Sequence, residues 1–242
     1  DGSAALSWSS VATDLDGLSD SKSEGTNFTG SLLVGHQTTG TLDAATYNSG
    51  VGLTALDALT SGDYNTAVGY SSLTDNTTGA ANTAHGNQTL FKNITGDRNT
   101  AIGHHSLYQN TAGSHNIAVG YKALTNTTGN SNTGVGTTAL TENTTGQYNV
   151  AVGMNVLRNL TTANFNTALG NNSLQDANRT ADTDGYNTAL GYNAGNTGTN
   201  DITTGNKNTL LGASTAASAA AGTNQTVIGY GASGKGDNTV TI

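Results

Sequence analysis

A five-residue pattern of alternating polar and apolar positions, Asn-Thr-Ala-Val-Gly with small variations, recurs along most of this chain. Looser copies begin at Ser31 and Gln225, and successive copies start 17 residues apart, with one spacing of 16 and two of 21. A fixed period of this length is typical of a solenoid, in which each repeat forms one coil stacked on the next. The clear copies begin at Asn48, Asn65, Asn82, Asn99, Asn116, Asn132, Asn149, Asn166, Asn187 and Asn208.

The motif predicts a short strand rather than a helix. Thr66 and Val68 point to one face of an extended segment, and Ala67 points to the other. A helix is disfavoured because apolar residues do not recur at intervals of three and four residues, and because Gly, Asn and Thr are weak helix formers. The sequence therefore predicts an all-β protein, a parallel β-roll or β-solenoid with coils of about 17 residues.

A second apolar position follows each motif, four residues after its Gly, and a polar turn ending in Gly comes next. We expect the strand Val, Ile and Leu residues and these leucines to form two inward-facing apolar columns. The asparagines would then lie over one another, with side-chain amides bonded up the stack. The leucines are Leu56, Leu73, Leu90, Leu107, Leu124, Leu140, Leu157 and Leu174.

The chain divides into two parts. Residues 1–30 lie outside the repeat and are expected to cap the first coil, a flexible linker being the other interpretation. Residues 31–242 form the β-solenoid repeat domain. The last residues, Thr239-Val-Thr-Ile242, start another copy of the strand, so we expect a C-terminal continuation to be missing.

A stack of such coils has little interior. Each coil directs about two large apolar side chains inward. At ~25 cal/mol per Å² of buried apolar surface, their stabilisation is small compared with the conformational entropy cost of roughly 1.5 kcal/mol per ordered residue. Several columns packed around a symmetry axis would share their apolar faces. The sequence therefore predicts a homo-oligomer, with a homotrimer as the first expectation.

The amino-acid composition limits the kinds of partner and site that this chain can have. Only 34% of residues are hydrophobic, but Pro is absent and only 10% are charged, which separates this chain from most disordered ones. The net charge is −8 and the eight basic residues are scattered, which argues against a nucleic-acid partner. No apolar run approaches the ~20 residues of a membrane span, so membrane insertion is not expected. Without Cys there is no thiol nucleophile or thiolate metal site.

The repeats also carry a resemblance to known families. The motif between Ser31 and Gly229 resembles the Ser-Val-Ala-Ile-Gly motif in head domains of trimeric autotransporter adhesins, which are left-handed parallel β-rolls assembled as trimers. The longer unit, Gly-Tyr-x-Ala-Leu followed by Asn-Thr-Thr-Gly as in 120–129, is similar to repeats of bacteriophage tail fibres. In those fibres a C-terminal chaperone domain follows, directs trimerisation and is cleaved. Residues 229–242 resemble the segment before that domain, although the coils here are longer than in adhesin heads, with Thr where Val is usual.

Few residues suggest chemistry. His85 occupies the strand position of Val68, expected to point inward, where three copies around an axis would hold a metal or an anion; a neutral, hydrogen-bonded His is the other interpretation. Asp182 and Asp184 are weak Ca²⁺ candidates without the ligand count of a proper loop. The run Gly229–Gly236 matches G-x-G-x-x-G, but a strand rather than a helix is expected after it, so we reject a nucleotide site. We expect no catalytic residues and no cofactor.

Tyrosines flank the motif and are candidates for stacking on sugars or for receptor contacts, the alternative being that they cover coil edges. These observations favour a structural and host-attachment segment of a phage tail fibre on the virion, with itself and a host cell-surface glycan or protein as partners. The head of a bacterial surface adhesin is the first alternative. An ice-binding solenoid with a ladder of strand Thr residues is the second. The candidate ligand-binding residues are Tyr64, Tyr70, Tyr121, Tyr148 and Tyr192.

Overall fold

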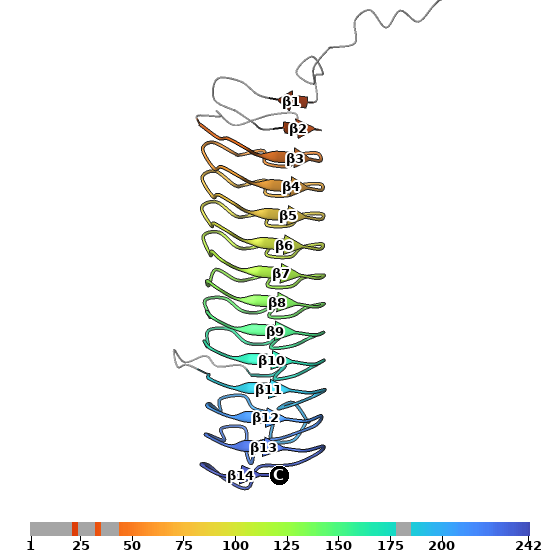
Figure 1. Ribbon diagram of the computed structural model, residues 1–242, viewed down its shortest axis with the longest axis vertical. Helices are drawn as coiled ribbons and strands as arrows, with labels where there is room; N and C mark the ends of the chain where they lie inside the picture. The colour runs from red at the N-terminus through yellow and green to blue at the C-terminus, as the bar shows by residue number, and fades with distance from the viewer. Residues whose placement is uncertain (1–20, 24–31, 35–43, 178–184) are drawn as a thin grey trace, which may run out of the picture.

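The computed structural model describes residues 21–23, 32–34, 44–177 and 185–242, and in that part every regular element is a β-strand. All strands belong to one 14-stranded sheet in which spatial order follows chain order (Figure 1). Only β1 runs antiparallel to its neighbour. The predicted all-β parallel solenoid is confirmed. The strands are β1 (Ser21–Ser23), β2 (Leu32–Val34), β3 (Ser49–Val51), β4 (Thr66–Val68), β5 (Thr83–His85), β6 (Thr100–Ile102), β7 (Ile117–Val119), β8 (Thr133–Val135), β9 (Val150–Val152), β10 (Thr167–Leu169), β11 (Thr188–Leu190), β12 (Thr209–Leu211), β13 (Thr226–Ile228) and β14 (Val240–Thr241).

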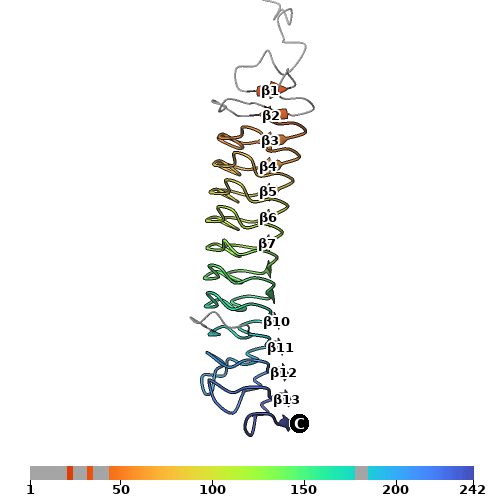
Figure 2. The same ribbon diagram turned by 90° about the vertical axis from the view of Figure 1, so that its left-hand side faces the viewer.

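Equivalent residues of successive coils pair in register, as Ala67 pairs with Ala84. The rest of the coil is also bonded to the next one: the Leu56 N–H donates to the Ser72 carbonyl at 3.1 Å. Twelve steps of ~4.8 Å from β2 to β14 give a stack roughly 58 Å tall. Figure 2 shows that the strands line one side of this stack. Backbone hydrogen bonds therefore tie each coil to the next along several parts of its path.

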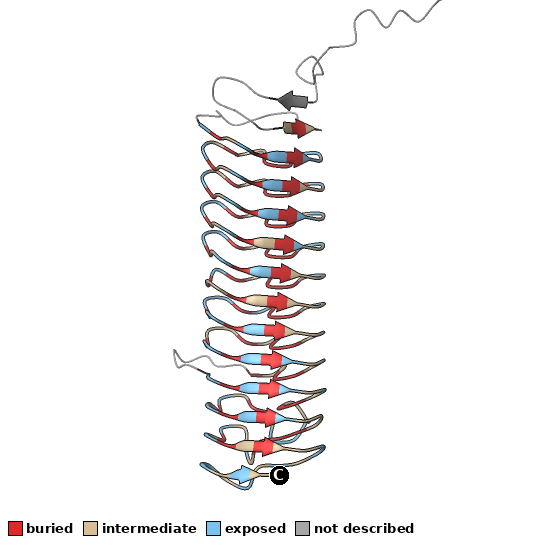
Figure 3. Ribbon diagram, viewed as in Figure 1, coloured by how far each residue is buried: buried red, intermediate tan, exposed pale blue. Residues whose placement is uncertain are grey.

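The strand side chains are oriented differently from our prediction. The central residue of each strand from β2 to β13, such as Ala67 or Ala101, is buried, whereas Ile102 is 43% exposed and Leu169 44% exposed (Figure 3). The prediction that the strand Val, Ile and Leu residues form an inward column is wrong. The predicted leucine column from Leu56 to Leu174 is fully buried. Most coils of this column thus point one large apolar side chain into the core, and the coils of Leu56 and Leu157 add a second buried leucine, Leu59 and Leu160.

The narrow cross-section of the coil explains this arrangement. A Cβ added to Gly134 would lie 3.1 Å from Cγ of Leu124, so the strand position opposite a leucine accepts only Gly or Ala. In β12 the sizes are exchanged, because the inward strand residue is Leu210 and the position opposite is Gly195. A Cβ on Gly195 would lie 2.9 Å from Cδ1 of Leu210. At this contact one large and one small side chain face each other, whichever side carries the large one.

All ten motif asparagines are buried at the start of their strands. The Oδ1 atom of Asn99 accepts a hydrogen bond from the backbone N–H of Asn116 at 3.0 Å, and its Nδ2 donates to the Gly113 carbonyl at 2.8 Å. The amides also bond one another in several coils, as Asn82 Nδ2 does to Asn65 Oδ1 at 3.1 Å. Each asparagine therefore satisfies a buried donor in the next coil and a buried acceptor in its own turn.

Each coil also contains left-handed residues that are not glycine. Ser71 and Leu73 both have φ near 52°, and Tyr64, just before the motif, has φ of 59°. The last position of the motif is glycine because a side chain does not fit there. Gly103 has φ of 124°, and a Cβ at this position would lie 2.6 Å from the Gly120 carbonyl oxygen. Stacked coils approach each other too closely at this corner for any side chain.

Candidate functional site

The most extensive exposed feature is an apolar column on the flat outer face of the sheet. The fourth residue of each motif points outward, and most are Val, Ile or Leu. Beside it runs a column made mainly of Thr, interrupted by Ile117 and Val150, which are also exposed. We call the outward column the apolar strip. It consists of Val51, Val68, His85, Ile102, Val119, Val135, Val152, Leu169, Leu190, Leu211 and Ile228.

His85 lies on the apolar strip and is exposed, so the expectation that it points into the coil is wrong. It pairs in register with Val68 and Ile102. No cluster of three or more metal-ligating side chains occurs in the described part of the chain. Asp182 and Asp184 lie outside the described residues, and nearby Asp176 accepts a hydrogen bond from Asn159 at 2.6 Å. The turn after Gly229 leads into β14, the strand expected there.

The aromatic residues before the motif stack along the solenoid. The rings of Tyr47 and Tyr64 lie 5.1 Å apart, and those of Tyr148, Phe165 and Tyr186 form a continuous stack with the same spacing. Tyr64 and Tyr148 each stack on one of these rings, so one face of each is covered by an aromatic neighbour. Both side chains remain more than half exposed.

The tyrosines after the motif are in a different environment. Tyr121 stacks on His104 at 5.6 Å, and the Lys122 ammonium lies 5.3 Å from the Tyr121 ring centre. Tyr70 and Tyr192 are about half exposed, and within the described residues neither ring stacks on another. Among the five tyrosine candidates, Tyr70 and Tyr192 therefore have no ring face stacked on another ring of the described residues.

A cluster of rings follows β6. The rings of His104 and His105 stack at 3.9 Å, His105 Nε2 lies 2.6 Å from Gln88 Oε1, and the His105 ring contacts Tyr108. Partial burial, followed by repulsion from His104 and Lys122, lowers the pKa of His105 below its ordinary value. The neutral imidazole is therefore favoured in the folded chain.

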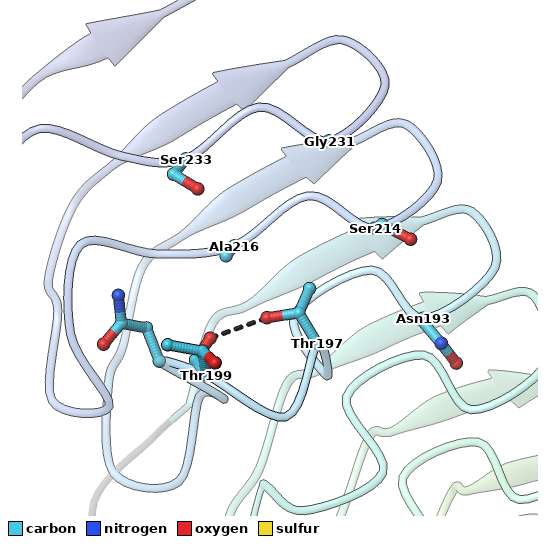
Figure 4. Close-up of a pocket in the computed structure, with 8 residues that line it drawn as sticks. Asn193, Thr197, Thr199, Ser214, Ala216, Gly231 and Ser233 are labelled. Carbon is cyan, nitrogen blue, oxygen red and sulfur yellow. Dashed lines mark hydrogen bonds between the residues drawn. The ribbon is translucent and has the colours of Figure 1, made fainter.

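A pocket of about 330 Å³ opens near the C-terminal end of the stack, beside the coils that follow β11, β12 and β13 (Figure 4). One wall is a column of coil residues and the other is the turn Thr197–Asn200, part of a 21-residue coil. The sequence analysis missed this pocket. The available signal was the end of the leucine column at Leu174, after which Gly195, Ala216 and Ser233 take its place. The lining residues are Asn193, Thr197, Thr199, Asn200, Ser214, Ala216, Gly231 and Ser233.

Within the described residues no helix is long and apolar enough to cross a membrane. The fold and its exposed surfaces define the class: a parallel β-solenoid repeat protein with an apolar strip along its sheet and a polar pocket near its C-terminal end. No family model, no curated protein and no solved structure matches this chain.

Proposed function

We propose that this chain is a structural and host-attachment segment of a phage tail fibre, assembled as a homotrimer on the outside of the virion. The proposal assigns it no catalysis, no cofactor and no nucleic-acid partner. The observation that carries it is the apolar strip, which follows the sheet from β3 to β13 with one interruption, at His85. A monomer leaves this strip in water.

The length and continuity of the strip support self-association. Eleven strands at ~4.8 Å give a length of roughly 50 Å, and a three-residue strand is about 10 Å wide, so the flat face, with the apolar strip and the Thr column together, covers on the order of 500 Å². The apolar strip takes about half of this face as a single column, and an exposed apolar surface of this kind often marks an interaction site. Flat faces of equal length on three copies pack around one axis, and cyclic symmetry makes the same surface serve every copy.

The remaining surface suits attachment. The coils are tied by backbone hydrogen bonds and paired asparagines, which gives a stiff rod. The turns on the other sides present Asn, Thr and Tyr side chains to a host cell-surface glycan or protein. Few charges lie on this surface, so binding would depend on hydrogen bonds and ring stacking more than on electrostatic attraction.

Mass in solution tests the assembly. A homotrimer has three times the 24.3 kDa of one chain, and the double variant Ile102→Lys and Leu169→Lys, which places charges on the apolar strip, should reduce that mass to one chain. The matched control, Thr128→Lys, adds a charge to an exposed turn and should leave the trimer intact. A wild-type chain that stays monomeric at micromolar concentration rejects the trimer.

Attachment is tested by measuring binding of the labelled wild-type chain to host cells, in competition with the unlabelled chain. Binding that does not saturate, or no binding at all, leaves only a spacer role. The head of a bacterial surface adhesin remains the alternative of the same architecture, located on the cell surface. A chaperone domain downstream in the full gene supports the tail fibre, and a coiled-coil stalk with a membrane anchor supports the adhesin.

The exposed Thr column favours an ice-binding solenoid as a second candidate. Thr66, Thr83 and Thr100 follow one another in register beside the apolar strip on a flat face. Ile117 and Val150 interrupt the column further along, which weakens this candidate. A thermal-hysteresis measurement on the purified chain decides it, since a tail-fibre segment should show none.

A further inference from the structure

The pocket near the C-terminal end is built by a local change of the repeat. At the coil position that holds Leu174 in the preceding coil, the next three coils carry Gly195, Ala216 and Ser233. Ala216 and Ser233 form a parallel bridge there, so this corner of the coil is extended. The large inward side chain moves to the strand, as Leu210 and Val227, and the core stays filled. Small residues at the corner leave the space that becomes the pocket.

The second wall is a fixed turn. Oδ1 of Asp201 accepts hydrogen bonds from the backbone N–H groups of Thr197 at 2.5 Å and Gly198 at 2.7 Å. The Thr197 hydroxyl donates to the Thr199 carbonyl at 2.6 Å (Figure 4). Ile202, which follows, is buried and anchors the turn to the core. The pocket is therefore formed before any ligand arrives, which limits the ordering cost of binding.

Most polar groups around the pocket are unused by the protein. Within the described residues, the side chains of Ser214, Ser233, Thr199 and Asn200 make no hydrogen bonds to other protein groups. No ionisable side chain is among the lining residues. Hydroxyls and carboxamides both donate and accept, so they match a neutral ligand rich in hydroxyl groups better than an anion or a cation.

A chain of side-chain hydrogen bonds ends at this pocket. The Thr138 hydroxyl donates to Asn155, Asn155 donates to Asn172 at 3.2 Å, and Asn172 donates to Oδ1 of Asn193 at 3.0 Å. The Nδ2 group of Asn193, which has no acceptor within the described residues, is the last donor of the chain. Because successive bonds polarise one another in the same direction, this N–H group is a strengthened donor at the pocket.

Two exposed tyrosines flank the lining column. Tyr192 precedes Asn193 and is 56% exposed, and Tyr230 precedes Gly231 and is 88% exposed. They occupy the same coil position two steps apart, with Ala213 between them, so their attachment points are separated by roughly 9.6 Å. A ring inserted over Ala213 would lie about 4.8 Å from each, inside the 4.5–7 Å range of stacked rings.

We infer that this pocket is a binding site for a neutral saccharide, with Tyr192 and Tyr230 packing on the apolar faces of a sugar ring and Asn193, Ser214 and Ser233 bonding its hydroxyls. The inference deepens the attachment function proposed above and rests on it for the biological source of the sugar. The pocket volume falls within the ~300–1,000 Å³ of small-molecule sites and accommodates one or two sugar rings.

Saturation-transfer difference NMR on the purified full chain tests the site. The probes are the methyl glycosides of glucose, galactose, mannose and N-acetylglucosamine, with glucuronate and galactose 6-sulfate as charged comparators. At least one neutral glycoside should bind, with an affinity in the millimolar range, about −4 kcal/mol. Ser233→Phe, which fills the pocket, should abolish the signal.

The double variant Tyr192→Ala and Tyr230→Ala should weaken binding about tenfold, and it remains informative if Ser233→Phe disturbs folding. Its matched control is Tyr70→Ala with Tyr121→Ala, which removes tyrosines of the same column away from this pocket. The inference is overturned if no neutral glycoside binds, if only charged probes bind, or if both pairs weaken binding equally. A trimer that attaches to cells but binds no glycoside overturns this site alone, whereas glycoside binding by a monomer that attaches to no cell overturns only the proposed function.

Discussion

The exchange of large and small side chains across the core makes a prediction that can be tested in the middle of the stack. Leu107 and Ala118 are both fully buried, in the coil after β6 and in β7. They correspond to Gly195 and Leu210, where the large residue is on the strand. If the core requires only one large side chain per layer, the double change Leu107→Gly with Ala118→Leu should be tolerated far better than either single change.

The structure sets the expected magnitudes. Leu107→Gly removes a fully buried side chain and leaves a cavity, which lowers the free energy of unfolding by about 3–5 kcal/mol. Because Leu107 has a left-handed φ of 51°, which glycine adopts without strain, up to about 1 kcal/mol of this loss is recovered. Ala118→Leu forces three extra carbons against Leu107 and costs about 1–3 kcal/mol or more. In the double variant the new leucine fills the cavity, so the free energy of unfolding should recover by about 2 kcal/mol or more relative to the sum of the single changes.

Urea unfolding followed by far-UV circular dichroism measures the free energy of unfolding of the wild-type chain, the two single variants and the double variant. Solenoid arrays do not always unfold in one step, so hydrogen exchange of the amides in β6 and β7 provides a local measure of the same stability. The reasoning fails if the two changes are additive. That result would mean that Gly195 and Leu210 are independent substitutions and that the coil is wide enough for two large residues.

Three further predictions concern single positions. Asn99→Ala should destabilise the chain by about 1–3 kcal/mol because it leaves the buried N–H of Asn116 unpaired, while the Gly113 carbonyl keeps its hydrogen bond from Asn110; urea unfolding measures the change, and one below about 1 kcal/mol contradicts the role of the ladder. Arg98→Gly should stabilise by up to about 1 kcal/mol, because Arg98 has φ of 54° on the surface; an unchanged or lowered melting temperature speaks against strain there. The lowered pKa of His105 means that the unfolded chain binds its proton more readily. Stability should therefore be full above the ordinary pKa of 6.5 and fall as the pH drops below it, and His105→Asn should reduce this dependence in thermal melts at pH 5 and 8.

The period of the sequence was sufficient to predict the fold. A motif that returns every 17 residues with a Gly at a fixed place has few other physical solutions, because each Gly marks a corner where coils approach closely. The leucine column also followed from spacing alone. The buried asparagines were predicted to stack, but the pattern did not show that their main partners are backbone groups, as for Asn99 and Gly113.

The direction of the strand side chains could not be read from the motif. Alternation separates Ala67 from Val68, and hydrophobicity favours burying Val68, which is the wrong choice. The deciding factor is the width of the coil, set by how far Leu73 reaches across it, and this distance is not encoded in a pattern along one strand. Side-chain volumes identify the inward position: where the strand centre is large, as at Leu210, the residue opposite is small.

The same comparison locates the pocket. From β4 to β11 every strand centre is small, and in that stretch the leucine position holds leucine from Leu73 to Leu174, so the coil corner has one shape. After Leu174 both positions change together, and the corner that loses its leucine is where the free hydroxyls and carboxamides gather. The length changes in other turns leave the buried positions of the coil unchanged. The change after Leu174 is different, because it exchanges the buried residues, keeps the core filled and opens a pocket at the surface. In the function that we propose, the break in the repeat at Gly195, Ala216 and Ser233 separates the supporting rod from the binding end.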